Sequence, residues 1–433
     1  MRSKENDVSA IEIFMLKGRN YNIMKFNKDG WLFDDNNKYH YIEEKDIYEL
    51  MEITKSKNEN FQKGVVNNTK NYADPLIRKL SFLNIAMVQR FQLDKVILSF
   101  NSTMDFFRGE NQKFSSSLPS IRRIMKNNTE EDESINAIEE LKVYNFSNFI
   151  FNFNIIPNWL LYIGDVNFKA LAQHYGFKTN LLDLTNNFLV ALFFATTKYD
   201  STSDSYYPLT KEDIEKDEQT KYGVIFHSPN WTLDYLNQLS LLNPYNKVTE
   251  IDSGQYDGYA FQIGYQPFMR CHQQYGYIYP MRYHKDLQSD SRFEKIYFKQ
   301  SPELSKKVYD MMHQGKDIFP YEGINYAKEY LDKIKNEYKF YIEDVKDVYE
   351  TIVNKKIFPT FDIFKNKLLS FNCNNSIEIL DDPIKYEIDN DTLNKINEYY
   401  DINKILENSN ISTSIDVEDY LEKRRNVLNI INT

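Results

Sequence analysis

Cysteine is almost absent from this chain. Two cysteines occur in 433 residues, Cys271 and Cys373, and they form no Cys-x-x-Cys pair. Because disulfide frameworks and cysteine-based zinc sites need several closely spaced cysteines, we expect neither. The histidines show no metal-like spacing among themselves or with the cysteines, so we expect no metal centre.

Long apolar runs and excess positive charge are also missing. No apolar run reaches the roughly 18 residues of a membrane-spanning helix, and the opening sequence MRSKENDVSA lacks the apolar segment of a signal peptide. The net charge of −10 provides no overall field that would attract nucleic acid, although a local basic patch remains open. The composition therefore predicts a cytoplasmic protein without membrane contact.

Three common functional motifs do not occur: Gly-x-x-x-x-Gly-Lys-[Ser/Thr], Gly-x-Gly-x-x-Gly and Gly-x-Ser-x-Gly. Their absence argues against P-loop, Rossmann and hydrolase-elbow sites. A metal-dependent nuclease is disfavoured as well, because no clustered carboxylate pair with metal-ligand spacing is present.

The C-terminal part of the chain contains no glycine. Gly323 is the last one, and only two prolines follow it, Pro359 and Pro383. The Lys/Glu-rich sequence beyond it keeps apolar residues at helical spacing, which predicts a helical C-terminal region over residues 331–433. Its apolar faces need a partner, so we expect them to dock on the core or on a second copy of the chain.

The remaining sequence divides into two predicted parts. Residues 1–75 predict a β-rich unit, with strand-like runs at 11–16, 21–26 and 30–33, a hairpin signal Asn-Lys-Asp-Gly and a short helix at 47–53. Residues 76–330 form the main predicted domain. Its expected elements are helices within 76–95, 135–151 and 235–242, strands at 95–100, 223–226 and 277–281, and a polar surface insertion at 200–221.

Residues 171–195, LAQHYGFKTNLLDLTNNFLVALFFA, stand out within this domain. Asp183, Thr185, Asn186 and Asn187 are suitable helix N-caps, and residues 189–195 read as a buried helix too short to cross a bilayer. Polar residues around the start of a buried helix can hold an anion or a sugar. The alternative is a capped core helix with nothing bound.

Three further islands accompany this stretch. They are Arg108-Gly109 after the strand at 95–100, Arg270 with Gln274 and Gly276, and residues 318–324 with Glu322. In this order, together with His-Tyr-Gly-x-x-Thr-x-Leu-Leu-Asp-x-Thr, they resemble the bacterial FRG family over roughly residues 90–330. Two positions depart from that family: Asn180 stands where Arg is more frequent, and Leu184 where Trp is frequent.

The residue types suggest an anion site. Arg108 can make bidentate bonds to phosphate while Gly109 lets the ligand approach closely. The alternative for Arg108 is a buried structural arginine paired with Glu110 or Asp183, and Arg270 has the same two readings. His174 and Tyr175 can supply a proton donor and a stacking face, or can be structural.

A second, weaker likeness is to ADP-ribosyltransferases. Arg108-Gly109, then Asp183-Leu184-Thr185, then Ala-Leu-Phe-Phe-Ala at 191–195 and Gln274-Tyr275-Gly276 follow that family's order. Gly276 stands where the family's catalytic Glu would be. Under this likeness Asp183 or Glu322 would supply the acid.

We therefore expect an α+β fold, a mixed ADP-ribosyltransferase-like sheet flanked by helices. The two resemblances imply an NAD-using effector that transfers ADP-ribose to protein or nucleic acid, or hydrolyses NAD, and that serves as a bacterial toxin or in antiviral defence. His174, Asp183 and Glu322 would be catalytic. The nucleotide would contact Arg108, Gly109, Tyr175, Thr185, Arg270 and Gln274. The alternative is a non-catalytic nucleotide-sensing module.

Overall fold

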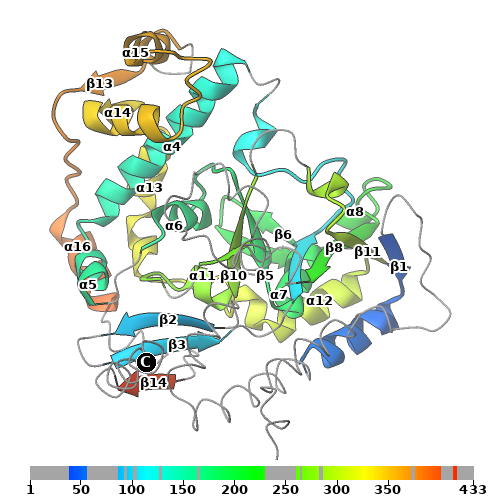
Figure 1. Cartoon of the computed structure of the whole chain (residues 1–433). Coiled ribbons are helices and arrows are strands. Elements are labelled where there is room, and N and C mark those ends of the chain that lie inside the picture. The colour runs from blue at the N-terminus through cyan, green and yellow to red at the C-terminus, as the bar shows by residue number, and fades with distance from the viewer. Residues whose placement is uncertain are drawn as a thin grey trace, which may run out of the picture.

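A seven-stranded mixed sheet lies at the centre of the protein (Figure 1). The computed structural model describes residues 39–55, 86–91, 95–100, 105–125, 129–162, 166–229, 260–263, 266–281, 286–371, 376–400 and 413–416. In the described part the strand order is β1-β11-β8-β4-β5-β10-β9, parallel between β1 and β11 and antiparallel elsewhere. The expected α+β class with a mixed sheet is confirmed. The strands are β1 (Tyr39–Ile42), β4 (Asp105–Glu110), β5 (Leu181–Thr185), β8 (Tyr222–Pro229), β9 (Phe261–Gln262), β10 (Gly276–Pro280) and β11 (Glu294–Lys299).

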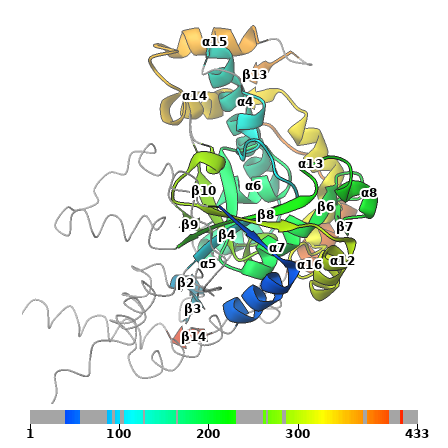
Figure 2. The same cartoon turned by 90° about the vertical axis from the view of Figure 1, so that its right-hand side faces the viewer.

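Apolar layers cover both faces of this sheet. Alternate residues of β4 point to opposite sides, so Phe106 and Phe107 enter different clusters. The face of the sheet on which Phe107 lies packs against α7 (Phe188–Thr196), α12 (Pro302–Met311) and the helix at residues 44–55 (Figure 2). The Phe106 cluster contains Leu182, Leu184, Val224, Phe226, Tyr277, Tyr279, Met281 and Tyr297. Strands buried on both faces explain the near-continuous apolar runs of the central sequence.

Helix α7 is the buried helix that the central stretch predicts. Its N-cap is Asn187, whose side chain accepts from the Leu189 N–H at 2.9 Å. Asp183 and Thr185, also considered as caps, lie instead in strand β5. The expectation of a cap from these two residues is therefore wrong, because Leu181 and Leu182 extend into the sheet and carry the following residues with them.

A long helix, α4 (Glu130–Ile150), links the sheet to the C-terminal region. It begins at Thr129, whose side chain accepts from the Asp132 N–H. One part of α4 packs with α5 (Ile155–Tyr162), α6 (Phe168–His174) and α13 (Lys328–Lys335). Its Ala137, Ile138 and Leu141 join a separate cluster with the C-terminal elements. Part of the described C-terminal region thus docks on α4.

That second cluster lies at the far end of α4, away from the sheet (Figure 1). It is built from β12 (Lys339–Tyr341), α14 (Ile342–Thr351), α15 (Phe361–Leu369) and β13 (Glu378–Leu380). Helix α16 (Asn390–Tyr399) returns to the larger core, where Ile396 and Tyr400 are buried. The described C-terminal segment is therefore mainly helical, with one short strand pair.

One predicted helix is wrong. Ala86–Phe91 forms strand β2, which pairs antiparallel with β3 (Lys95–Phe100) in a small sheet that β14 (Thr413–Asp416) completes. The apolar spacing over residues 76–95 was helical, but backbone pairing with the β-branched sequence of β3 outweighs that weak signal. The strand runs at 11–16, 21–26 and 30–33, the helix at 235–242 and Cys373 lie outside the described residues.

The remaining elements connect these layers. The predicted polar surface insertion at 200–221 contains the turn and second strand of a hairpin and a short helix, and many of its residues are exposed. The connecting elements are β6 (Thr197–Asp200), β7 (Ser205–Pro208), α8 (Lys211–Ile214), α11 (Arg270–Gln273), and the 3₁₀ turns η2 (Ile121–Arg123), η3 (Leu287–Ser289), η4 (His313–Gly315) and η5 (Gly323–Ala327). In the part of the chain that the structure describes, no helix has the length and apolarity to cross a membrane.

Truncating Phe364 to Ala should destabilise the C-terminal cluster by about 3–5 kcal/mol, because the fully buried ring leaves a cavity. Ile363→Ala is the matched control, since the Ile363 side chain is 50% exposed; it should change stability by about 0.5 kcal/mol or less. Denaturant unfolding of both variants measures the difference. Equal effects would show that the cluster does not stabilise the fold.

A buried ion cluster in the sheet should make stability depend on pH. His227 Nδ1 contacts Glu294, and its Nε2 lies 3.8 Å from Asp105 Oδ1. Burial alone lowers the pKa of His227, but the two carboxylates outweigh it and raise the pKa to about 9. Since this folded-state pKa exceeds the ordinary 6.5, the stabilisation is complete below pH 6.5 and is lost as pH rises through about 9.

The test compares the unfolding free energy of the unsubstituted protein and His227→Gln at about pH 6 and about pH 10. The difference between the two proteins should shrink at the higher pH. A difference that stays constant would mean that His227 is neutral in the folded state.

Candidate functional site

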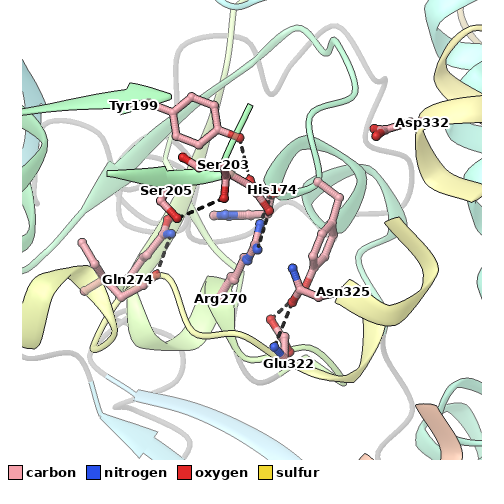
Figure 3. A network of polar contacts seen from close by, with 12 residues as sticks. His174, Tyr199, Ser203, Ser205, Arg270, Gln274, Glu322, Asn325 and Asp332 are labelled. Carbon is pink, nitrogen blue, oxygen red and sulfur yellow. Dashed lines mark hydrogen bonds and ion pairs between the residues drawn. The ribbon is translucent and has the colours of Figure 1, made fainter. Parts of the chain in front are cut away.

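A cavity of about 880 Å³ opens beside β4 and β5. These strands share one register pair, Phe107 with Thr185, and no further pair follows. The Arg108 Nη1 donates to the Asp183 carbonyl at 3.0 Å, so a side chain bridges the strands where the ladder ends. The other walls come from the α6–β5 turn, the β6–β7 hairpin, α11 and the η5–α13 segment (Figure 3).

This cavity gathers almost all of the residues that the sequence singled out, despite their separation along the chain. Glu322 is the exception, since it lies outside the lining. The predicted residues that line the cavity are Arg108, Gly109, His174, Tyr175, Asp183, Thr185, Arg270 and Gln274.

Charged side chains of both signs face the cavity, with cations in slight excess. The cations in its wall are Arg108, Arg123, Arg270, Lys328 and Lys335, and the acids are Glu110, Asp183, Asp204 and Asp332. The whole chain carries a net charge of −10. A cationic excess at one cavity of an acidic protein favours an anionic ligand.

Asp183 is an accessible carboxylate of this wall, with its side chain 44% exposed. Gln173 orients it by donating an amide N–H to Oδ1. The Thr179 hydroxyl in turn donates to the Gln173 carbonyl oxygen. Two residues of the central motif and the glutamine just before it therefore form one polar chain that ends on a carboxylate open to a ligand.

His174 lies next to that carboxylate. Its Nε2 is buried, lies 3.9 Å from Asp183 Oδ1 and has no hydrogen-bond partner among the described residues. Burial lowers the pKa of His174, and the positive charge of Arg270 lowers it further. The negative charge of Asp183 raises the pKa but does not outweigh burial. The imidazole is therefore neutral near pH 7, with a ring nitrogen available to accept or share a proton.

Arg108 combines both roles that the sequence left open. Its Nε donates to Glu110 at 3.1 Å, and Glu110 also accepts from the Ser117 hydroxyl at 2.8 Å. The Arg108 side chain is 17% exposed, and its Nη2 has no partner among the described residues. One edge of the guanidinium thus holds the strands while another edge faces the cavity.

Arg270 is more deeply buried. Its guanidinium lies between the rings of Phe319, at 3.7 Å, and Tyr175, at 4.8 Å. It donates to the His174 carbonyl at 3.1 Å and reaches Asp204 of the β6–β7 turn at 3.4 Å (Figure 3). Its Nε is buried without a partner in the described part of the chain. Arg270 therefore joins α6, α11 and the hairpin around the cavity.

Tyr175 and Glu322 anchor this arrangement from behind. The Tyr175 hydroxyl donates to Glu322 at 2.7 Å, and its ring packs on Phe146 and Phe268. Glu322 also accepts from the Met269 N–H and from the Tyr400 hydroxyl. Burial raises the pKa of Glu322, and these donors limit the rise. Tyr175 thus has no free face for stacking on a ligand, and Glu322 is a structural anchor.

Thr185 and Gln274 have internal partners too. The Thr185 hydroxyl donates to the Gln274 carbonyl at 2.7 Å and accepts from the Asn187 N–H. The Gln274 amide donates to the Ile318 carbonyl at 2.9 Å. These contacts join β5, α7 and α11, so both residues shape the wall of the cavity.

Gly109 has a packing role that the sequence did not indicate. A Cβ atom at this position would lie 1.7 Å from the Ala191 carbonyl oxygen of α7. The missing side chain therefore lets the helix approach the sheet. Gly109 also lines the cavity, so the approach of a ligand at this position stays a prediction. Because β4 alternates its faces, the adjacent Arg108 lies on the other side of the strand.

The buried Cys271 and the half-buried His272 follow Arg270 in α11. Burial lowers the pKa of His272 to about 4 and raises the pKa of the Cys271 thiol well above its ordinary value. Among the described residues, no group of three or more His, Cys, Asp and Glu side chains could hold a metal ion.

Several lining residues were not predicted. Asp204 belongs to the stretch expected to be plain surface, yet the β6–β7 hairpin carries it to Arg270, and the Tyr199 hydroxyl holds it at 2.6 Å. Arg123 and Gln173 are equally unmarked in sequence. Gln173 precedes the motif directly, which is the one local signal that could have indicated it.

Replacing Gly109 by Ala should prevent α7 from seating on β4, because the clash is with backbone that has nowhere to move. We expect a loss of about 3 kcal/mol or more, or little soluble protein. Gly176→Ala is the comparison. Gly176 has φ 88° and meets only the flexible Lys335 side chain, at 3.3 Å, so the strain should be about 1–2 kcal/mol. Similar melting temperatures for the two variants would contradict the close-packing role.

Comparison with known proteins supports the motif reading. Residues 104–204 match the FRG domain family. This range includes Arg108, the central motif, α7 and strand β6, and it ends at Asp204 in the β6–β7 turn. No curated protein and no solved structure matches the chain. The resemblance inferred from the motifs is confirmed, and the chain carries an FRG domain at residues 104–204.

Proposed function

We propose that this chain is an NAD⁺-using enzyme similar to ADP-ribosyltransferases. The observation that carries the proposal is the pairing of an accessible carboxylate, Asp183, with the neutral His174 in a cavity that also presents Arg108. A volume of about 880 Å³ lies within the range that holds small-molecule ligands and cofactors. The cationic excess of the wall suits the pyrophosphate of a dinucleotide.

The strand layout adds support. Arg108 lies on β4, Asp183 and Thr185 on β5, and Gly276 begins β10. Thr185 pairs with Gly276 on one side, while Phe107, next to Arg108, pairs with it on the other. An ADP-ribosyltransferase-like core would place its arginine, its central polar strand and its acid on neighbouring strands in this way. Gly276 cannot supply the acid, so Asp183, two residues along β5 from Thr185, takes that role in our proposal.

The proposed reaction breaks the bond between ribose C1′ and the nicotinamide nitrogen. Nicotinamide leaves with the bonding electron pair, and the Asp183 carboxylate stabilises the positive charge that develops on the ribose. An acceptor hydroxyl or a water oxygen bonds to C1′. Its proton passes to Nε2 of His174 and then to solvent. With water the products are ADP-ribose, nicotinamide and one proton.

The biological setting belongs to the same proposal. Loss of NAD⁺, or modification of a macromolecule with ADP-ribose, would harm a cell, which is consistent with a bacterial toxin or an antiviral defence effector in the cytoplasm. The acceptor can be protein, nucleic acid or water. Self-association through the C-terminal helices is a further part of this proposal, since Ile363 and Leu369 expose apolar surface there.

A second candidate is a nucleotide-sensing module without turnover. Gly276 at the expected acid position favours it, as does the internal bonding of Tyr175, Thr185 and Gln274. Both candidates share the binding cavity. They differ in whether nicotinamide is released.

The decisive variant is Asp183→Asn. It should keep NAD⁺ binding within a few-fold but reduce nicotinamide release by about a hundredfold or more, because the amide cannot stabilise a cationic transition state. Asp332→Asn is the matched control, since Asp332 lines the same cavity but its partner is Lys335 at 2.9 Å. Calorimetric titration gives binding, and chromatography of released nicotinamide gives turnover.

Two results would contradict the proposal. Equal turnover in both variants would remove Asp183 from the reaction. Tight NAD⁺ binding with no nicotinamide release by the unsubstituted protein would favour the sensing module.

A further inference from the structure

The mouth of the cavity has its own set of lining residues. Phe114, Ser115, Ser116 and Arg123 all line the cavity and are exposed, whereas His174 and Arg270 at the other end are buried. They come from the segment that joins β4 to η2. The cavity therefore has one part where the side chains of His174 and Arg270 are buried, and another part where an aromatic ring and a guanidinium are exposed.

This mouth segment is anchored along its length. The Asn111 side chain donates to the Thr197 carbonyl at 2.8 Å, and the Lys113 N–H donates to the Gln219 carbonyl at 3.0 Å. The Ser117 N–H donates to Asp286 at 2.9 Å, and the Gln288 amide donates to the Phe114 carbonyl at 3.2 Å. A segment held by three separate parts of the chain presents its side chains in a preformed arrangement.

Phe114 is an unusual side chain for such a position. Its ring is 39% exposed, and it makes no ring contact with the described aromatic residues. Tyr199 also lines the cavity and is 48% exposed, but it packs on Tyr206 and Phe319 and bonds Asp204. An anchored aromatic face left open to water at a cavity mouth is suited to stacking with a flat ring of a ligand.

Arg123 adds a second cation on the same side as Arg108. Its Nε donates to the Leu118 carbonyl of the same segment at 3.0 Å. This bond uses Nε alone, so the two terminal nitrogens can bind other partners. Partial burial and the charge of Arg108 lower the pKa of Arg123, so the two like charges lie close enough to interact. A phosphate between them would relieve that repulsion.

We propose that the mouth segment, residues 111–123, binds the adenosine diphosphate half of the ligand. Phe114 stacks on the adenine, and Arg123 with Arg108 binds the two phosphates. The nicotinamide ribose then reaches the accessible carboxylate of Asp183 beside the buried His174. This assignment rests on the proposed function and deepens it, because it makes Phe114 and Arg123 the residues that select a dinucleotide over a mononucleotide.

The experiment measures binding of ADP-ribose and of nicotinamide mononucleotide by calorimetric titration, so that no turnover occurs. Phe114→Ala and Arg123→Ala should each weaken ADP-ribose binding about tenfold. Both variants should leave nicotinamide mononucleotide binding within about twofold, since that ligand lacks the adenosine half. Melting temperatures confirm that each variant is folded, which is expected because both side chains are exposed.

Matched controls come from the same chain. Arg122→Ala removes the same charge one residue away but outside the cavity lining, and Phe151→Ala removes a ring that is 45% exposed and also outside the lining. Neither should change the affinity for ADP-ribose. Tyr199→Ala tests whether the adenine stacks on the ring of Tyr199 instead of that of Phe114.

Three results would overturn the assignment. Equal weakening of both ligands by Phe114→Ala and Arg123→Ala would show that the mouth does not distinguish the two halves. Loss of ADP-ribose binding in Tyr199→Ala but not in Phe114→Ala would move the adenine to the hairpin. Binding of neither ligand to the unsubstituted protein would remove the proposed function as well, whereas the first two results leave it intact.

Discussion

The site depends on one interruption in the sheet. Strands β4 and β5 pair at Phe107 and Thr185 and nowhere else. Backbone groups that would continue the ladder need other partners, and the Asp183 carbonyl takes its partner from the Arg108 guanidinium. The gap that results is bordered by polar backbone and by the side chains of both strands. A cavity with functional groups therefore forms beside strands whose side chains are mainly apolar.

Close packing on the other side of β4 keeps that gap in place. Gly109 allows the backbone of α7 to touch the strand, and α7 is buried along almost its whole length. Protein interiors transmit small displacements because they are densely packed. A helix seated this tightly gives Arg108 a rigid base, so its guanidinium can bridge the strands and face the cavity at once.

The buried charges are supported by aromatic residues and by the C-terminal region. Arg270 lies between Tyr175 and Phe319, and Tyr175 bonds Glu322, which also accepts from Tyr400 after the last described helix of the C-terminal region. A buried charge is tolerated where hydrogen bonds and aromatic faces replace water. The far end of the chain thus stabilises the wall of a cavity that the FRG domain forms only in part, although it supplies no group to the proposed reaction.

The sequence by itself determined which residue types the site contains and many of the local elements. The apolar run after Asn187 specifies helix α7, the β-branched and aromatic runs specify strands, and the spacing of the central motif marks Asp183 and His174, because these signals depend on neighbours along the chain. Tertiary structure decided which residues a ligand can reach and which already bond to other residues of the protein. Gly109 faces a helix, Glu322 lies behind Tyr175, and Asp204 reaches Arg270, since each of these outcomes depends on contacts between segments far apart in sequence. Residue type tells what a side chain can bond, but only packing tells whether a partner within the protein has already taken that bond.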